Sequence, residues 1–312
     1  MRSGTQQEAE GPTGCLSAQR PGGPRTAMES TTLELETVEI SWAHLRMPPF
    51  PQVALRVLQL ASNENVQLGT LGELISSDPA FASEVLTIAN SLLYAPRYPI
   101  KSILQAIEVL GATHLQGLCL TVGVRAYLGK SLGHPTMRML WRHNLACAVI
   151  AQQIASAGFM DREIAYTAGV LHGIGLLGMA VVRPREFIHL LGTHIGTAAS
   201  LLERERAIFG MDHCELGKKL IGEWQLPEDF ALVMSGPHAP RRSDGHWDMP
   251  EIVGLSCRMA DAAGFAPFSA CHAASFEELA EELPPRERKL FHTDVETLTF
   301  EVSKKIGALE AA

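Results

Sequence analysis

The chain has 312 residues, of which 46% are hydrophobic and 19% are charged. This length is enough for one large domain or two domains of ordinary size, each with a substantial buried core. The formal net charge of −8 at pH 7, without any local run of Lys and Arg, provides no basic footprint for nucleic acid. The composition therefore favours a globular protein and excludes nucleic acid from the expected partners.

Residues 1–37 differ from the rest of the chain. They are rich in Gly, Pro, Ser, Thr and Gln and have almost no large apolar side chains before residue 33. Such a segment cannot offset its ordering entropy by burial, so we expect a disordered N-terminal extension. Met28 is a candidate for the natural start.

From residue 38 onward the apolar pattern is helical. In "TLGE", Thr70 and Glu73 form a predicted capping box. Asp78 as N-cap and Pro79 at the first helical position predict the start of the next helix. The stretch "SILQAIEVLGATHLQGLCLTVGVRAYLG" predicts two helices that are separated near Gly111.

A Gly- and Pro-containing region at 129–135 is the predicted internal boundary, between an N-terminal helical lobe (38–133) and a second lobe (134–312). In the second lobe, "TMRMLWRHNLACAVIAQQIASAG" predicts a long helix, and "DREIAYTAGVLHGIGLLGMAVV" predicts one further helix capped by Asp161. Further helices are expected at 184–191, 195–208, 212–223, 227–236, 249–263, 275–290 and 293–308, with Asp212–Glu215 and Thr293–Glu296 as capping pairs. Because strand-like alternation is almost absent, the predicted fold class is all-α.

The six cysteines contain no CxxC pair, and four of them lie in apolar helical stretches: Cys119, Cys147, Cys214 and Cys257. This usage is typical of reduced thiols that act as small hydrophobic residues. The N-terminus has no apolar segment like that of a signal peptide. The apolar run "AGVLHGIGLLGMAVV" is shorter than the about 20 residues that a membrane-spanning helix needs. We therefore expect a cytoplasmic protein with no membrane partner.

Five polar residues stand out in or beside the apolar helices: His143, His172, His213, His238 and Asp261. Imidazole and carboxylate groups from different helices are how a helical bundle builds a metal site. Each histidine also has a simpler interpretation, as a hydrogen-bonded residue of the core or the surface. From the residues alone, both interpretations stay open.

A series of segments in a fixed order resembles the HDOD family, a divergent branch of the HD superfamily found in bacterial signalling proteins. Between about residues 44 and 262 these segments include "MPPFPQVALRVLQLAS", "LGELISSDPAFASEVLTIANSLLY", "LWRHNLACAVIAQQIA", "AYTAGVLHGIGLLG", "GMDHCELGKKLIGEWQLPEDF" and "RMADAAG". The resemblance implies an N-terminal helical bundle lobe packed on a C-terminal lobe related to HD phosphohydrolases.

Catalytic HD proteins carry a His, then a His-Asp pair, then a distant Asp. The resemblance places His143 at the first position, His172 in the pair and Asp261 at the end. His213 and His238 correspond to the additional histidines that many such proteins contain.

The chain departs from the catalytic pattern at the pair itself, where Gly173 stands in place of the aspartate, and Leu176 stands in place of a lysine. A carboxylate commonly bridges the two ions of a dinuclear hydrolase and offsets their repulsion. Only Asp261 is left to supply that charge. We therefore expect no cofactor and no metal, so that the candidate residues are relics of a ligand set. One mononuclear option is a triad of His143, His172 and Asp261.

The resemblance implies a non-catalytic signal-transduction or regulatory module that acts through contacts with an unidentified signalling protein. A connection to cyclic-dinucleotide signalling is one option. The alternative is a degenerate metal-dependent HD-type phosphohydrolase acting on nucleotides or cyclic dinucleotides. The loops around "MPPFP" and "NSLLYAPRYP" are where a partner would be sought, although each can equally be a structural turn. The sequence does not predict an oligomeric state.

Overall fold

The computed structural model describes residues 47–61, 67–91, 94–158, 160–192, 198–235, 247–267, 274–291 and 294–310. All regular elements within these ranges are helical, which confirms the all-α prediction. The predicted extension 1–37 and His238 lie outside the described residues.

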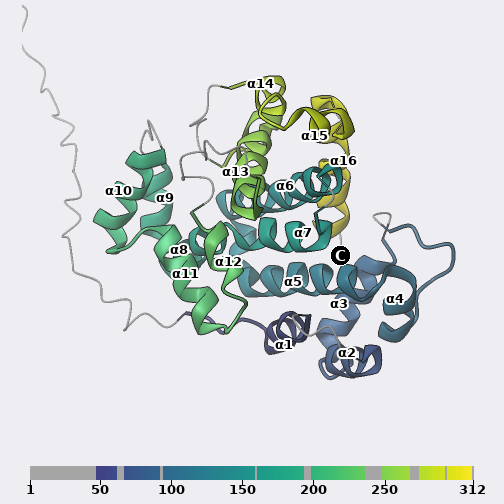
Figure 1. Ribbon diagram of the computed structural model, residues 1–312. Coiled ribbons are helices and arrows are strands. Elements are labelled where there is room, and N and C mark those ends of the chain that lie inside the picture. Colours follow the sequence, from purple (N-terminus) through teal and green to yellow (C-terminus); the bar gives the residue numbers. More distant parts are fainter. Residues whose placement is uncertain are drawn as a thin grey trace, which may run out of the picture. The chain divides into compact units, whose positions relative to one another are not determined.

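The first helices pack around a shared apolar core, with α1 against α5 and α2 against α4 (Figure 1). Their bounds are α1 (Gln52–Ala61), α2 (Leu68–Ser76), α3 (Pro79–Ala89), α4 (Ile103–Leu110) and α5 (Ala112–Leu128). Asp78 caps α3 by accepting hydrogen bonds from two backbone N–H groups, and α4 and α5 are separated at Gly111, both as predicted. The predicted capping box at Thr70 is wrong, because α2 already begins at Leu68.

The chain continues through a 3₁₀ turn, η2 (Gly129–Gly133), into the longest helix, α6. The remaining elements are α6 (Pro135–Ala157), α7 (Arg162–Leu171), α8 (Ile174–Val182), α9 (Pro184–Gly192), α10 (Ala198–Phe209), α11 (His213–Glu223), α12 (Asp229–Val233), α13 (Met249–Ala260), the π-helical turn η4 (Asp261–Phe265), α14 (Phe276–Ala280), α15 (Pro285–Leu290) and α16 (Val295–Glu310). Asp161 caps α7, and Asp212 with Glu215 forms a capping box at α11, as predicted.

Two helix predictions are wrong. The stretch expected as one helix after Asp161 forms α7 and α8, which are separated at His172 and Gly173. The stretch expected at 275–290 forms the two short helices α14 and α15. The predicted Thr293 cap lies outside the described residues.

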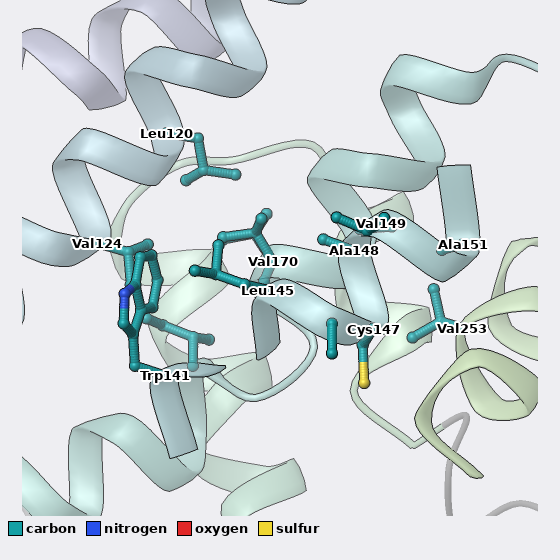
Figure 2. Packing of buried hydrophobic residues seen from close by; sticks show 14 of the residues in the cluster. Leu120, Val124, Trp141, Leu145, Cys147, Ala148, Val149, Ala151, Val170 and Val253 are labelled. Carbon is teal, nitrogen blue, oxygen red and sulfur yellow. The ribbon is translucent and has the colours of Figure 1, made fainter. Parts of the chain in front are cut away.

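Helix α6 lies at the centre of the described fold. Helix α7 lies between α5 and α6, and α13 packs against α6 (Figure 1). Figure 2 shows the apolar side chains that α6 contributes to this core, including Trp141, Leu145 and Cys147, together with Val170 of α7 and Val253 of α13. The cluster of buried residues continues from α1 through α16, and the division into lobes at residue 133 stays a prediction.

Within the "MPPFP" segment, Phe50 is part of this core. Phe50 is 2% exposed, and its ring centroid lies 4.5 Å from that of Trp224, the C-cap residue of α11. Tyr127 completes this aromatic group, with its ring centroid 5.8 Å from both of the other rings. Phe50 therefore ties the segment before α1 to α5 and to the end of α11.

Two glycines allow unusually close helix contacts. A Cβ on Gly169 of α7 would lie 2.5 Å from Cα of Ala148 on α6. A Cβ on Gly175 of α8 would lie 1.9 Å from the carbonyl oxygen of His213 on α11. These distances leave no room for a side chain. Each of the two helix pairs can therefore approach this closely only because glycine stands at the contact.

Residues Arg162–Val182 are long and apolar enough to cross a membrane when judged by length and composition alone. In the fold they are α7 and α8, and 78% of their most apolar window is buried. A buried core helix passes the same test, so this finding does not bear on location, and the cytoplasmic location stays a prediction.

Candidate functional site

Two histidines and two cysteines meet where α6, α7 and α13 pack together. His143 and Cys147 lie one turn apart on α6, His172 is the C-cap residue of α7, and Cys257 is on α13. Their possible ligand atoms all lie within 4.8 Å of one another. The Nε2 atom of His143 is 3.4 Å from Sγ of Cys147 and 3.3 Å from Sγ of Cys257. We refer to these four residues as the two-His, two-Cys cluster.

The other ring nitrogen of each histidine is held by oxygen atoms outside the cluster. The Nδ1 atom of His143 lies 3.2 Å from the carbonyl oxygen of Phe265 and 3.3 Å from Oδ1 of Asp261. The Nδ1 atom of His172 lies 2.6 Å from the carbonyl oxygen of Gly169. A proton on Nδ1 satisfies these oxygen acceptors, so each Nε2 is directed toward the cluster.

Local chain geometry explains these outer contacts. Gly169 lies in the last turn of α7, where carbonyl groups lack partners within the helix, and the ring of His172 supplies one. After α13 the chain forms η4, in which Gly264 has a φ of +89°. That conformation favours glycine, and the turn directs the next carbonyl, of Phe265, at His143.

His143, Cys147 and His172 are buried and Cys257 is half-buried, and the groups of the cluster polarise one another. Burial opposes the charged form of His143, but Cys257 and Asp261 outweigh it and raise the pKa of His143 to about 10. The pKa of Cys257 is held well below its ordinary value, first by a hydrogen bond from Cys147 and then by His143. Burial, and then Cys257, raise the pKa of Cys147. The directions of these shifts favour a proton on His143 over one on Cys257.

The residues do not fit the dinuclear centre of catalytic HD proteins. A Cβ on Gly173 would lie 2.3 Å from Oδ1 and 2.6 Å from Nδ2 of Asn144, which is 2% exposed. The amide of Asn144 occupies this space and donates a 3.3 Å hydrogen bond to the carbonyl oxygen of Val170. An aspartate at 173 would need Asn144 to move. Without one, Asp261 is the remaining carboxylate of the HD pattern, and it lies at Nδ1 of His143 rather than among the four ligand atoms of the cluster.

The structure brings together three of the five predicted site residues. His143 and His172 lie side by side, with ring centroids 5.7 Å apart, and Asp261 contacts the Nδ1 side of His143, which faces away from the sulfur atoms. His213 is not part of the cluster. Its Nδ1 lies 2.6 Å from Oε2 of the fully buried Glu205. Burial opposes charging of His213, but Glu205 outweighs it and raises the pKa of His213 to about 10.

Sequence reasoning missed both cysteines, which it interpreted as small core residues. One signal was present: Cys147 follows His143 by four residues, and Cys257 precedes Asp261 by four. Residues at this spacing share one face of a helix. Nothing in the sequence showed that these two helix faces meet each other and His172.

A second polar group lines a cavity of about 220 Å³ between α5, α6, α7 and α16. Glu163 lies there 3.0 Å from Nδ1 of His114 and 2.8 Å from Nε of Arg162. Burial opposes ionisation of Glu163, but His114 and Arg162 outweigh it and lower its pKa. Lys305 lines the same cavity, and burial lowers its pKa. Sequence reasoning did not identify this cavity.

Comparison with known proteins decides the family. A family model of the HDOD domain matches residues 47–240, which is more than half of the chain. The chain belongs to the HDOD family. An uncharacterized protein of Treponema pallidum (strain Nichols) is 26% identical over 202 residues, which cover 62% of this HDOD chain and 39% of that protein. The chain therefore spans about two fifths of this relative.

Solved structures share the fold. An HDOD domain protein of Geobacter sulfurreducens has a TM-score of 0.64 and 23% identity, covering 86% of this chain and 92% of that one. A protein of Marinobacter aquaeolei VT8 named for signal transduction has a TM-score of 0.68 and 24% identity, and the match covers 85% of this chain and 60% of that one. A protein of Shewanella amazonensis SB2B named as a phosphohydrolase has a TM-score of 0.62 and 19% identity, and the match covers 84% of this chain and 94% of that one. These likenesses confirm the predicted HDOD fold and speak to the fold alone.

Proposed function

We propose that this HDOD chain is a regulatory module of signal transduction that does not hydrolyse phosphate esters and that acts through protein contacts. The observation that carries the proposal is the amide of Asn144 in the space where the aspartate of an HD pair would project from position 173. A hydrolase of the HD type depends on that carboxylate to hold its ions, and this chain has no substitute carboxylate in the cluster.

Exposed apolar side chains around α4 support the second half of the proposal. Tyr98 is 68% exposed, and Leu104 and Val109 are 49% and 55% exposed. Arg97 lies over the Tyr98 ring, with its guanidinium carbon 5.6 Å from the centroid. Apolar and aromatic side chains with an adjacent arginine are typical of protein interfaces. Of the two loops considered from the sequence, the one that contains Tyr98 is thus the better candidate for a partner contact.

Hydrolysis assays test the first half of the proposal. The full chain is incubated with nucleotides and cyclic dinucleotides in Mn²⁺, Mg²⁺ or Fe²⁺, next to a His172→Ala variant. We expect equal, background-level product from both proteins. Turnover by the wild-type chain that the variant loses would establish the alternative, a metal-dependent phosphohydrolase.

Affinity capture from the host tests the second half. Leu104→Glu/Val109→Glu should lose a partner that the wild-type chain retains, because charge at these exposed positions opposes an apolar contact without disturbing the core. Phe300→Glu is a matched control, since Phe300 is 70% exposed on α16. Capture that is equal for all three proteins would refute a contact at α4.

A further inference from the structure

We propose that the two-His, two-Cys cluster is a zinc site, in which Nε2 of His143 and His172 and Sγ of Cys147 and Cys257 hold one Zn²⁺ ion in a closed tetrahedral shell. Two nitrogen and two sulfur ligands in tetrahedral geometry are the donor set that favours zinc. The inference is independent of the proposed function. It also differs from the HD pattern, which contains neither cysteine.

The distances fit such a shell. With Zn–N of about 2.0 Å and Zn–S of about 2.3 Å, the ligand atoms of a tetrahedral site lie about 3.3–3.8 Å apart. The separations from His143 Nε2 to Sγ of Cys147 and Cys257 are 3.4 Å and 3.3 Å, and every pair of ligand atoms lies within 4.8 Å. Small side-chain rotations are therefore enough to close the shell.

The outer contacts suit metal ligation. Zinc-binding histidines commonly donate their second ring N–H to a carboxylate or a backbone carbonyl, which fixes the ring and the tautomer. His143 faces Asp261 and the carbonyl oxygen of Phe265 in this way, and His172 faces that of Gly169. Both histidines are thus oriented with Nε2 toward the sulfur atoms, an arrangement that a disulfide between the cysteines would not require.

The charges also balance. Two thiolates neutralise one Zn²⁺ ion, so the buried cluster carries no net charge when both histidines are neutral. On binding, Zn²⁺ exchanges its bound water molecules for two Zn–S and two Zn–N bonds, and two protons pass to solvent from the thiols or imidazoles that carried them. Catalytic HD proteins have an aspartate at the position of Gly173. Here the two thiolates supply the negative charge, which is enough for one ion but not for two.

All four positions of the shell belong to the protein, so no position is left for a substrate water. Such a site is structural: it links α6, α7 and α13 through one ion and stabilises the fold instead of performing chemistry.

Metal analysis of the full chain tests the proposal directly. We expect the purified protein to contain zinc at a ratio close to one per chain. After removal of zinc by a chelator, added Co²⁺ should give the visible bands of a tetrahedral site and a thiolate-to-cobalt charge-transfer band. Added zinc should restore a higher unfolding temperature than that of the metal-free chain.

Matched variants locate the site. Cys147→Ala and Cys257→Ala should lose stoichiometric zinc, while Cys119→Ala, at a buried position on α5 outside the cluster, should keep it. Asp261→Asn should keep the cobalt spectrum and weaken zinc affinity by about 10–100-fold. The metal titration of the wild-type chain decides the matter even if a variant fails to fold.

Three outcomes would overturn the proposal: no uptake of zinc or cobalt by the folded wild-type chain, an unchanged cobalt spectrum in either cluster variant, or a Cys147–Cys257 disulfide in the freshly purified protein. A failure here leaves the hydrolysis assays unaffected, because those assays ask only whether phosphate esters are cleaved.

Discussion

Replacing Gly173 by alanine tests the packing argument on which the proposed function rests. The added Cβ would lie 2.3 Å, 2.6 Å and 2.8 Å from Oδ1, Nδ2 and Cγ of Asn144. Gly173 has a φ of −95° and a ψ of 10°, a sparsely populated conformation that is nevertheless open to alanine. Most of the cost of the substitution therefore comes from the contact with Asn144.

The magnitude follows from what Asn144 must give up. Its side chain is buried and bonds to the carbonyl oxygen of Val170 at 3.3 Å, so moving it strains the packing and weakens that hydrogen bond. Overpacking of this kind costs about 1–3 kcal/mol. For a chain of 312 residues we expect the unfolding temperature to fall by roughly 1.5–2 °C for each kcal/mol.

Urea unfolding of Gly173→Ala measures this cost. Gly307→Ala on α16 is the matched control, because nothing lies within 4 Å of the added Cβ, and alanine stabilises a helix relative to glycine by about 0.5–1 kcal/mol. In an Asn144→Ala background the cost of Gly173→Ala should shrink. A Gly173→Ala protein that is as stable as the Gly307→Ala control would refute the claim that Asn144 fills the aspartate position.

Two further substitutions are informative. Gly175→Ala should destabilise more than Gly173→Ala, by more than about 3 kcal/mol in urea unfolding, because its Cβ meets a backbone carbonyl, of His213, that cannot rotate away; equal costs would show that α8 and α11 separate freely. Burial opposes the charged form of His213, but Glu205 outweighs it and raises the His213 pKa from its ordinary 6.5 to about 10. The ion pair between His213 and Glu205 therefore stabilises the fold fully below pH 6.5, and this contribution is lost as pH rises through about 10. Glu205→Gln should remove that pH dependence and cost about 3 kcal/mol at neutral pH; an unchanged pH profile in unfolding experiments would contradict the ion pair.

Local rules predicted most helices. Caps at Asp78, Asp161 and Asp212 follow from side chains that accept hydrogen bonds from the first backbone N–H groups of their helices. The same rules failed at Thr70, where the helix begins two residues earlier at Leu68. They also failed at His172–Gly173, because the apolar pattern of α7 and α8 is continuous and does not show that the helix ends there.

The sequence by itself determined the all-α class, because helical periodicity and caps depend on neighbours within a few residues. The resemblance to HD proteins singled out His143, His172 and Asp261, and the structure places them together. Only the tertiary structure decided what surrounds these histidines. Cys257 is 114 residues from His143 along the chain, yet the packing of α13 on α6 brings its sulfur within 3.3 Å of the ring. Such a contact depends on which helix faces meet, and that is set by packing over the whole fold rather than by local spacing.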